Sequence, residues 1–317
     1  MGRLKRLVQG EQAALVLALL LLCAVLSILT PVFLSAANLK NVLRDASLIA
    51  IAGIGMVMVI LAGEIDLSPG SVQAVVGILA VQLLNQTESI FLALLGALIV
   101  GALIGLLNGL LVTRAHINSL IATLGSMAIL RGGAMVGTQA VSIQAQVEGF
   151  TEVGTGYWGP LPIPVLVAAI LLILFYFILH HTPAGRYLYA VGGNAQAARL
   201  AGLPVERLKL AAFAISGVLA ALSAFILASR LNSGQPNAGL GFELQVIAAV
   251  VLGGVSLSGG LGTLVGAVLG ILILTVLNNG LVLLDVSSFY HDIARGTVII
   301  LAVYLDTRRR QQAQGRV

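Results

Sequence analysis

Charged residues are scarce in this chain. Of its 317 residues, 17 are Lys or Arg and 12 are Asp or Glu, so 9% are charged, whereas about a quarter are charged in an average soluble domain. Hydrophobic residues make up 59%. This composition excludes a soluble fold, and the two-residue alternation of outer-membrane barrels is also missing. We therefore expect an all-α polytopic membrane protein in which each span uses about 20 apolar residues.

Reactive side chains are just as sparse. The single cysteine, Cys23, lies in the first apolar run, so the chain has no disulfide framework. None of the three lysines follows a glycine-rich stretch, which excludes a nucleotide phosphate loop. The pair His180-His181 has no further ligand nearby, and neither a Ser-His-Asp order nor a zinc-protease motif occurs. We expect no catalytic residue, metal site or bound cofactor, and the scattered basic residues argue against nucleic-acid binding.

Ten apolar segments are candidate membrane spans. They cover residues 13–34, 46–62, 72–84, 90–112, 118–137, 162–179, 210–229, 243–256, 263–284 and 292–305. Several hold fewer than 18 residues, so we expect eight to ten transmembrane helices, some of them broken or re-entrant.

The basic residues between the spans indicate the topology. Twelve fall in loops on one side of the membrane, and only Lys40, Arg44 and Arg230 fall on the other. Because positively charged loops stay in the cytoplasm, we expect both termini there and a multi-pass protein of the plasma (inner) membrane.

Two short sequence pairs occur in the same order in the two halves of the chain. Residues 67–70 resemble 257–260, and residues 107–110 resemble 278–281. These pairs indicate a weak internal repeat, as in many transporters, within one transmembrane domain over residues 1–317.

The segment Gly63–Ser71 interrupts the apolar pattern with two carboxylates, a proline and two glycines. A continuous helix is not expected there. Non-helical backbone at membrane depth needs protein or a water-filled cavity around it, so this segment should bend at a cavity or at its mouth. Asp66 and Ser68 are therefore candidates for the wall of a path through the membrane. Capping of the following helix is the other interpretation, and both stay open.

A second break is expected at residues 253–262, where five of ten residues are glycine. Such a turn is flexible and lets helices approach closely. Glu243 precedes it and is one of few ionisable residues in the apolar segments. It is a further candidate for the path or for a proton relay, although pairing or snorkelling explains such residues more simply.

The basic loop at about 180–209 contains the signals of a short helix. Asn194 is a good N-cap, residues 195–201 are strong helix formers, Gly202 is a stop, and Pro204 prevents continuation. A helix of about 10 Å is not stable alone in water, so something must hold it. A cytoplasmic partner protein or the chain's own spans are the two alternatives.

At these residues the chain resembles the permease subunits of ribose- and arabinose-type ABC importers, within the branched-chain amino acid/ribose permease superfamily. The resemblance covers nearly the whole chain. It rests on stretches within 63–71, 185–202, 251–260, 277–281 and 286–288, of which the first is close to the family's Gly-Gly-Ile-Asp-Leu-Ser-x-Gly-Ser. Two departures occur there, because Glu64 replaces the usual Gly and Pro69 replaces a Val or similar residue.

The resemblance implies the chain's partners. It implies a second permease copy or paralogue around a shared path in the lipid bilayer, a cytoplasmic ABC ATPase that binds ATP and Mg, and a periplasmic or extracellular sugar-binding protein. It further implies that the helix 195–201 is the coupling helix seated in the ATPase. The coupling residues would be Arg186, Gly193, Asn194, Ala197, Ala198, Arg199 and Gly202. Asn278 and Asn279 join the candidates for the path.

The expected function is therefore import of a neutral monosaccharide, a pentose or a deoxyhexose, by a permease that is not itself an enzyme. Aromatic residues make up only 5% of the chain, so few side chains can stack on a sugar and selectivity should lie mainly in a partner. The alternative is a secondary sugar transporter driven by an ion gradient. That class would need a coupling-ion site at the midplane of the membrane.

Overall fold

The computed structural model describes residues 2–287 and, beyond them, residues 290, 293, 296, 297, 300 and 304. Within this described part the structure is almost entirely helical, which confirms the all-α prediction. The helices are α1 (Gly2–Leu29), α2 (Ala36–Leu61), α3 (Pro69–Thr87), α4 (Ile90–Thr113), α5 (Ser119–Thr138), α6 (Phe150–Thr155), α7 (Ile163–His181), α8 (Pro183–Gly193), α9 (Ala195–Leu200), α10 (Val205–Leu231), α11 (Phe242–Leu252) and α12 (Leu264–Leu283). Four two-residue strands are β1 (Ile143–Gln144), β2 (Tyr157–Trp158), β3 (Leu161–Pro162) and β4 (Ser233–Gly234).

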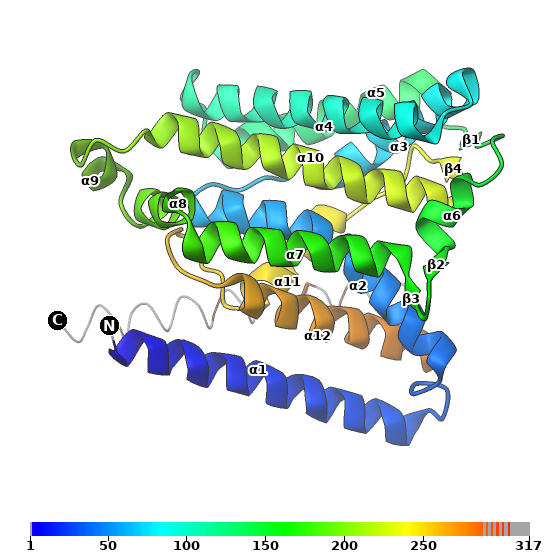
Figure 1. Ribbon diagram of the computed structural model, residues 1–317, viewed down its shortest axis with the longest axis horizontal. Coiled ribbons are helices and arrows are strands. Elements are labelled where there is room, and N and C mark those ends of the chain that lie inside the picture. Colours follow the sequence, from blue (N-terminus) through cyan, green and yellow to red (C-terminus); the bar gives the residue numbers. More distant parts are fainter. Residues whose placement is uncertain are drawn as a thin grey trace.

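The long helices lie side by side along one axis (Figure 1). The short helices α8 and α9 lie at one end, which we call the α9 end, and α6 with the four strands lies at the other, the α6 end. Strand β1 pairs with β4, and β2 with β3, both antiparallel. The bundle thus has two distinct ends and a long axis suited to crossing a bilayer.

Seven helices of the described part are long and apolar enough to cross a membrane, namely α1, α2, α4, α5, α7, α10 and α12. The 11 residues of α11 are too few to cross alone, and α3 begins with Pro69 at an interruption of the helical pattern. Broken segments are therefore present, as predicted. Most of the apolar segment 292–305 lies outside the described residues.

Helices α2 and α10 form the centre of the bundle. Every residue of α2 from Ala46 to Leu61 is buried, so this helix is surrounded by protein on all sides. Helix α10 approaches α4 closely because both carry glycines. A Cβ added to Gly217 would lie 2.1 Å from the carbonyl oxygen of Gly101. Such small-residue contacts let membrane helices pack backbone against backbone.

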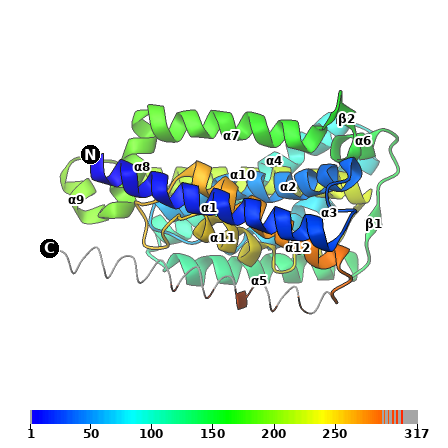
Figure 2. The same cartoon turned by 90° about the horizontal axis from the view of Figure 1, so that it is seen from below.

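The outer helices expose large apolar side chains. On α7, Ile170, Ile173 and Phe177 are 64%, 71% and 57% exposed. Figure 2 shows α7 and α5 on opposite sides of the bundle, with α2 between them. The apolar surface of α7 suits contact with lipid chains.

Candidate functional site

Helix α9 is closed at both ends by its own sequence. The Asn194 side-chain oxygen accepts the backbone N–H of Ala197 over 2.9 Å. At the other end Leu203 donates its N–H to the Ala198 carbonyl, and Gly202, at φ +80°, donates to the Arg199 carbonyl, each over 3.0 Å. This pair of bonds is a Schellman motif. The predicted cap and stop are confirmed, and the helix ends at Leu200, one residue before the predicted end.

Most of α9 projects into solvent. Ala198 alone is buried among its residues, where it packs with Val191 and Val205. Leu200 is 91% exposed, and Arg199 forms an exposed ion pair with Glu206. Six of the seven predicted coupling residues, all except Ala198, are exposed. A short helix with an exposed leucine at its tip suits a docking element.

Helix α8, which precedes α9, was not predicted from the sequence. The Thr182 hydroxyl caps it by accepting the N–H of Gly185, and Pro183 occupies its first position. A Thr-Pro pair is a typical helix start, so the signal was present. The Tyr189 hydroxyl of α8 donates to the Gly262 carbonyl over 3.0 Å, and burial raises the pKa of Tyr189. Helix α8 is thereby fixed to the loop between α11 and α12.

Glycines from three segments meet where α8 ends. A Cβ on Gly192 would lie 1.8 Å from the carbonyl oxygen of Leu61, and one on Gly260 would lie 2.5 Å from the Gly193 nitrogen. A Cβ on Gly259 would lie 2.7 Å from the Gly63 Cα. We call this contact of the end of α8 with the segment after α2 and the segment after α11 the glycine junction. It places α8 in direct contact with the two predicted breaks, at residues 63–71 and 253–262.

Asp66 lies inside a buried hydrogen-bond network. Its Oδ1 accepts the backbone N–H of Ser68 over 2.9 Å and the Ser68 hydroxyl over 2.6 Å. Its Oδ2 accepts the Ser216 hydroxyl of α10 over 2.9 Å. Asn108 of α4 donates to the Ser68 hydroxyl over 3.0 Å, and all four residues are at most 2% exposed. The network joins the break before α3 to α4 and α10.

A second charged contact holds the same break. Glu64 accepts a hydrogen bond from Lys209, which lies near the start of α10, and both side chains are largely buried. Lys209 is one helical turn from Glu206, the partner of Arg199 in α9. The Arg199–Glu206 pair therefore connects α9 to the start of α10, and the Lys209–Glu64 pair connects α10 to the break before α3. Sequence alone does not reveal this pairing, because 145 residues separate Glu64 from Lys209.

The other predicted path residues lie apart from one another. Glu243 is buried in the first turn of α11, where its carboxylate packs against the Gly70 backbone. Asn279 of α12 exchanges two amide hydrogen bonds with Asn38 of α2, over 3.0 and 2.8 Å. Asn278 is half-buried beside it. Only Asp66 and Ser68 come together, and the part of all five residues in transport stays a prediction.

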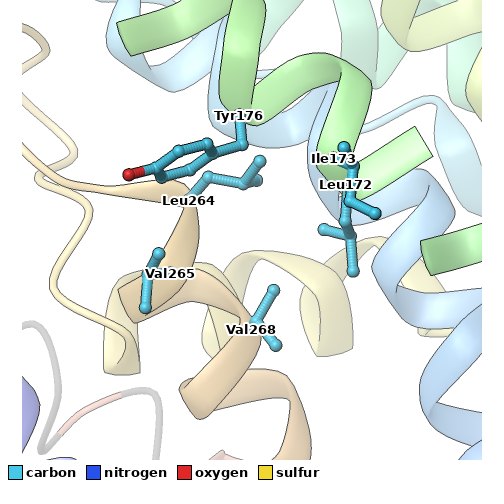
Figure 3. A pocket seen from close by; sticks show the side chains of 6 residues that line it. All are labelled: Leu172, Ile173, Tyr176, Leu264, Val265 and Val268. Atoms are coloured by element: carbon cyan, nitrogen blue, oxygen red, sulfur yellow. The ribbon is translucent and has the colours of Figure 1, made fainter. Parts of the chain in front are cut away.

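An apolar groove lies between α7 and α12, lined by Leu172, Ile173, Tyr176, Leu264, Val265 and Val268 (Figure 3). All six side chains present carbon to it, and the Tyr176 hydroxyl points away. A sugar needs hydrogen-bond partners for its hydroxyl groups. This groove is therefore unrelated to the polar residues described above.

The chain matches known transport proteins along most of its length. The profile of the family described as "Branched-chain amino acid transport system / permease component" matches residues 38–303. The "Ribose import permease protein RbsC" of Escherichia coli K12 is 44% identical over 307 residues, which cover 95% of this chain and 94% of that protein. The protein of the same name from Haemophilus influenzae is 43% identical over 294 residues, or 92% and 91% of the two chains.

A third relative carries a different sugar in its name. The "L-arabinose ABC transporter permease protein AraH" of Azospirillum brasilense is 38% identical over 302 residues, which cover 95% of this chain and 89% of that protein. No solved structure matches the chain.

Proposed function

The chain belongs to this family of transport-system permease components, and we propose that it imports a neutral monosaccharide, a pentose or a deoxyhexose, delivered by an external sugar-binding protein. Permeases of ABC transporters are not enzymes, because ATP is hydrolysed on a separate subunit. The names of the relatives, which specify ribose and L-arabinose, support a pentose.

The observation that carries the proposal is the exposed, doubly capped helix α9. We propose that it docks on the cytoplasmic ATPase, with Leu200 as its apolar anchor and Arg186, Gly193, Asn194, Ala197, Arg199 and Gly202 around it. ATP and Mg²⁺ bind to that subunit and not to this chain. Ala198 fixes the helix to the rest of the chain, since it is buried against Val191 and Val205.

The α9 end then faces the cytoplasm. Helix α1 begins at that end (Figure 1), so the N-terminus is cytoplasmic, and the distribution of basic residues among the loops predicts the same side for the C-terminus. Arg44 and Lys40, two of the three predicted external basic residues, lie against the Tyr157 ring at the α6 end. Reporter fusions after Leu203 and after Val317 test this topology, and both should read as cytoplasmic.

A second permease subunit, a copy or a paralogue, completes the path. Helix α5 exposes Gly125, Gly132, Gly133 and Gly137, and a Cβ at any of them would meet nothing within 4 Å. We call this surface the α5 face. These glycines let another backbone approach closely, and Ile129 and Val136 of the same helix, 75% and 81% exposed, offer apolar side chains to it. The path is expected between the α5 faces of the two subunits.

Reconstitution tests the function. Liposomes that hold the permease and its ATPase should take up ribose or L-arabinose only with ATP inside and the binding protein outside. Uptake driven by an ion gradient without the ATPase would instead identify a secondary transporter. A panel of pentoses, deoxyhexoses and charged sugars then identifies the substrate.

A further inference from the structure

The segment between β4 and α11, residues 235–241, is non-helical although it lies among membrane-spanning helices. It runs along α3, because a Cβ on Gly234 would lie 2.7 Å from the Ile78 Cα and one on Gly239 would lie 2.4 Å from the Gly70 carbonyl oxygen. Gln73 beside it donates to Ser223 of α10. Ser223 precedes the end of α10 by eight residues, or about 12 Å of helix. The segment therefore descends into the depth of the bundle.

Arg131 of α5 satisfies the backbone of this segment. Its guanidinium donates to the carbonyls of Pro236 and Ala238 over 2.9 and 2.6 Å, and to the carbonyl of Gly70 over 3.1 Å. Its charge interacts with Glu243. Non-helical backbone at membrane depth needs such partners.

Asn237 stands in the sequence between Pro236 and Ala238, whose carbonyls accept hydrogen bonds from Arg131. Asn237 is exposed, whereas Pro236 is buried. An amide facing lipid chains would lack hydrogen bonds and would be costly. Arg131 of α5 binds the carbonyls on both sides of Asn237 in the sequence, so Asn237 lies next to α5. The surface around Asn237 is therefore expected to face water or another protein chain.

We propose that Asn237 and the non-helical segment 235–241 form a sugar-binding subsite in the path, next to α5. The carboxamide donates and accepts hydrogen bonds, as the hydroxyl groups of a neutral sugar require. This subsite rests on the proposed function, and it places the contact with sugar on the segment before α11 and not at Asp66.

Cysteine labelling tests the subsite, because the chain has one cysteine, Cys23. In a Cys23→Ala background, Asn237→Cys should react with a charged methanethiosulfonate reagent added in water, and ribose or L-arabinose should slow the reaction. The control Ile173→Cys, on the lipid-facing side of α7, should stay unlabelled. Absence of labelling at Asn237→Cys, or labelling at the same rate with a transported sugar, overturns the subsite.

Substitutions give a second readout. Asn237→Thr keeps a donor and an acceptor and should retain uptake, whereas Asn237→Leu should lower uptake about fivefold, as for one lost hydrogen bond. ATP hydrolysis stimulated by the loaded binding protein should persist in both variants. Crosslinking of two subunits through Asn237→Cys without protection by sugar would make the residue an interface contact and overturn the proposal. If the Cys23→Ala parent itself shows no ATP-driven sugar uptake, the proposed function fails, which is a separate outcome.

Discussion

Gly260 donates its backbone N–H to the carbonyl oxygen of Leu61 over 3.0 Å. The bond joins the break after α2 to the break after α11. Gly192 of α8 packs against both the Leu61 oxygen and the Gly260 nitrogen. The two sequence stretches that resemble each other, 67–70 and 257–260, therefore belong to breaks that touch. A displacement of α8 that follows α9 would reach both breaks through this contact.

Gly192→Ala tests the glycine junction. The added carbon would lie 1.8 Å from the Leu61 oxygen and 2.6 Å from the Gly260 nitrogen, both of which belong to backbone. Overpacking of this kind costs about 1–3 kcal/mol, although Ala favours the helix. We expect insertion into the membrane to persist and sugar-stimulated ATP hydrolysis in liposomes to fall.

The matched control for that variant is Gly77→Ala in α3. Its added carbon would meet the Ala228 Cβ at 3.7 Å, an ordinary contact. Hydrolysis and uptake should stay normal in this control. Normal stimulated hydrolysis in Gly192→Ala would show that the junction does not transmit motion.

The Glu64–Lys209 ion pair is suited to a double-mutant cycle. Glu64→Gln or Lys209→Met alone leaves a largely buried charge without its partner, which should lower the free energy of unfolding by about 3 kcal/mol. The double variant Glu64→Gln/Lys209→Met removes both charges and should recover most of this loss. Thermal unfolding in detergent measures each variant. Asp45→Asn, which breaks the more exposed pair with Arg230, should cost under about 1 kcal/mol. Additive losses in the cycle would mean that the two charges do not interact.

Asp66 is expected to act through its hydrogen bonds to Ser68 and Ser216. Asp66→Asn keeps the acceptor for Ser68, and the Ser216 hydroxyl can turn to accept the new amide, so uptake should stay near normal. Asp66→Leu leaves the N–H of Ser68 and two hydroxyl groups without their acceptor, at about 1–3 kcal/mol for each buried group. Its abundance in the membrane and its uptake should both fall. Loss of uptake in Asp66→Asn at normal abundance would instead assign the charge a direct part in transport.

Local signals predicted helix α9 with its cap and its stop. Asn194 and Gly202 form hydrogen bonds with residues close to them in the sequence, so their roles as cap and stop could be inferred from sequence. The partners of Asp66 and Glu64 could not, because Ser216 and Lys209 are 150 and 145 residues away. Arg131 is visible in the sequence as an ionisable residue within a span, but its acceptors are backbone carbonyls, which any residue carries. Contacts of this kind follow from packing and leave no pattern in the chain.

Leu200 is expected to contribute to binding of the ATPase and not to folding. At 91% exposure it has almost no contacts to lose, so Leu200→Ser should leave the unfolding temperature unchanged. Burial of a leucine in a partner's groove is worth about 1.5–3 kcal/mol, so affinity for the ATPase should fall about tenfold or more. Leu161→Ser, at the α6 end, is the control and should not change this affinity. Equal affinity of Leu200→Ser and the parent would place the anchor elsewhere.

Gly202 fixes the direction in which the chain leaves α9. Its φ of +80° permits the bond from its N–H to the Arg199 carbonyl. Gly202→Pro can adopt neither this φ nor this hydrogen bond, so the end of α9 should unwind and the Arg199–Glu206 pair should be lost with it. Gly202→Asn tolerates the left-handed conformation and is the matched control. We expect both variants to insert, because no apolar span changes. In co-purification and in liposomes, Gly202→Pro should lose ATPase binding and sugar-stimulated hydrolysis together, whereas Gly202→Asn should retain most of both. Full ATPase binding and hydrolysis by Gly202→Pro would remove residues 194–202 from the coupling role, because no α9 with the present shape could persist in that variant.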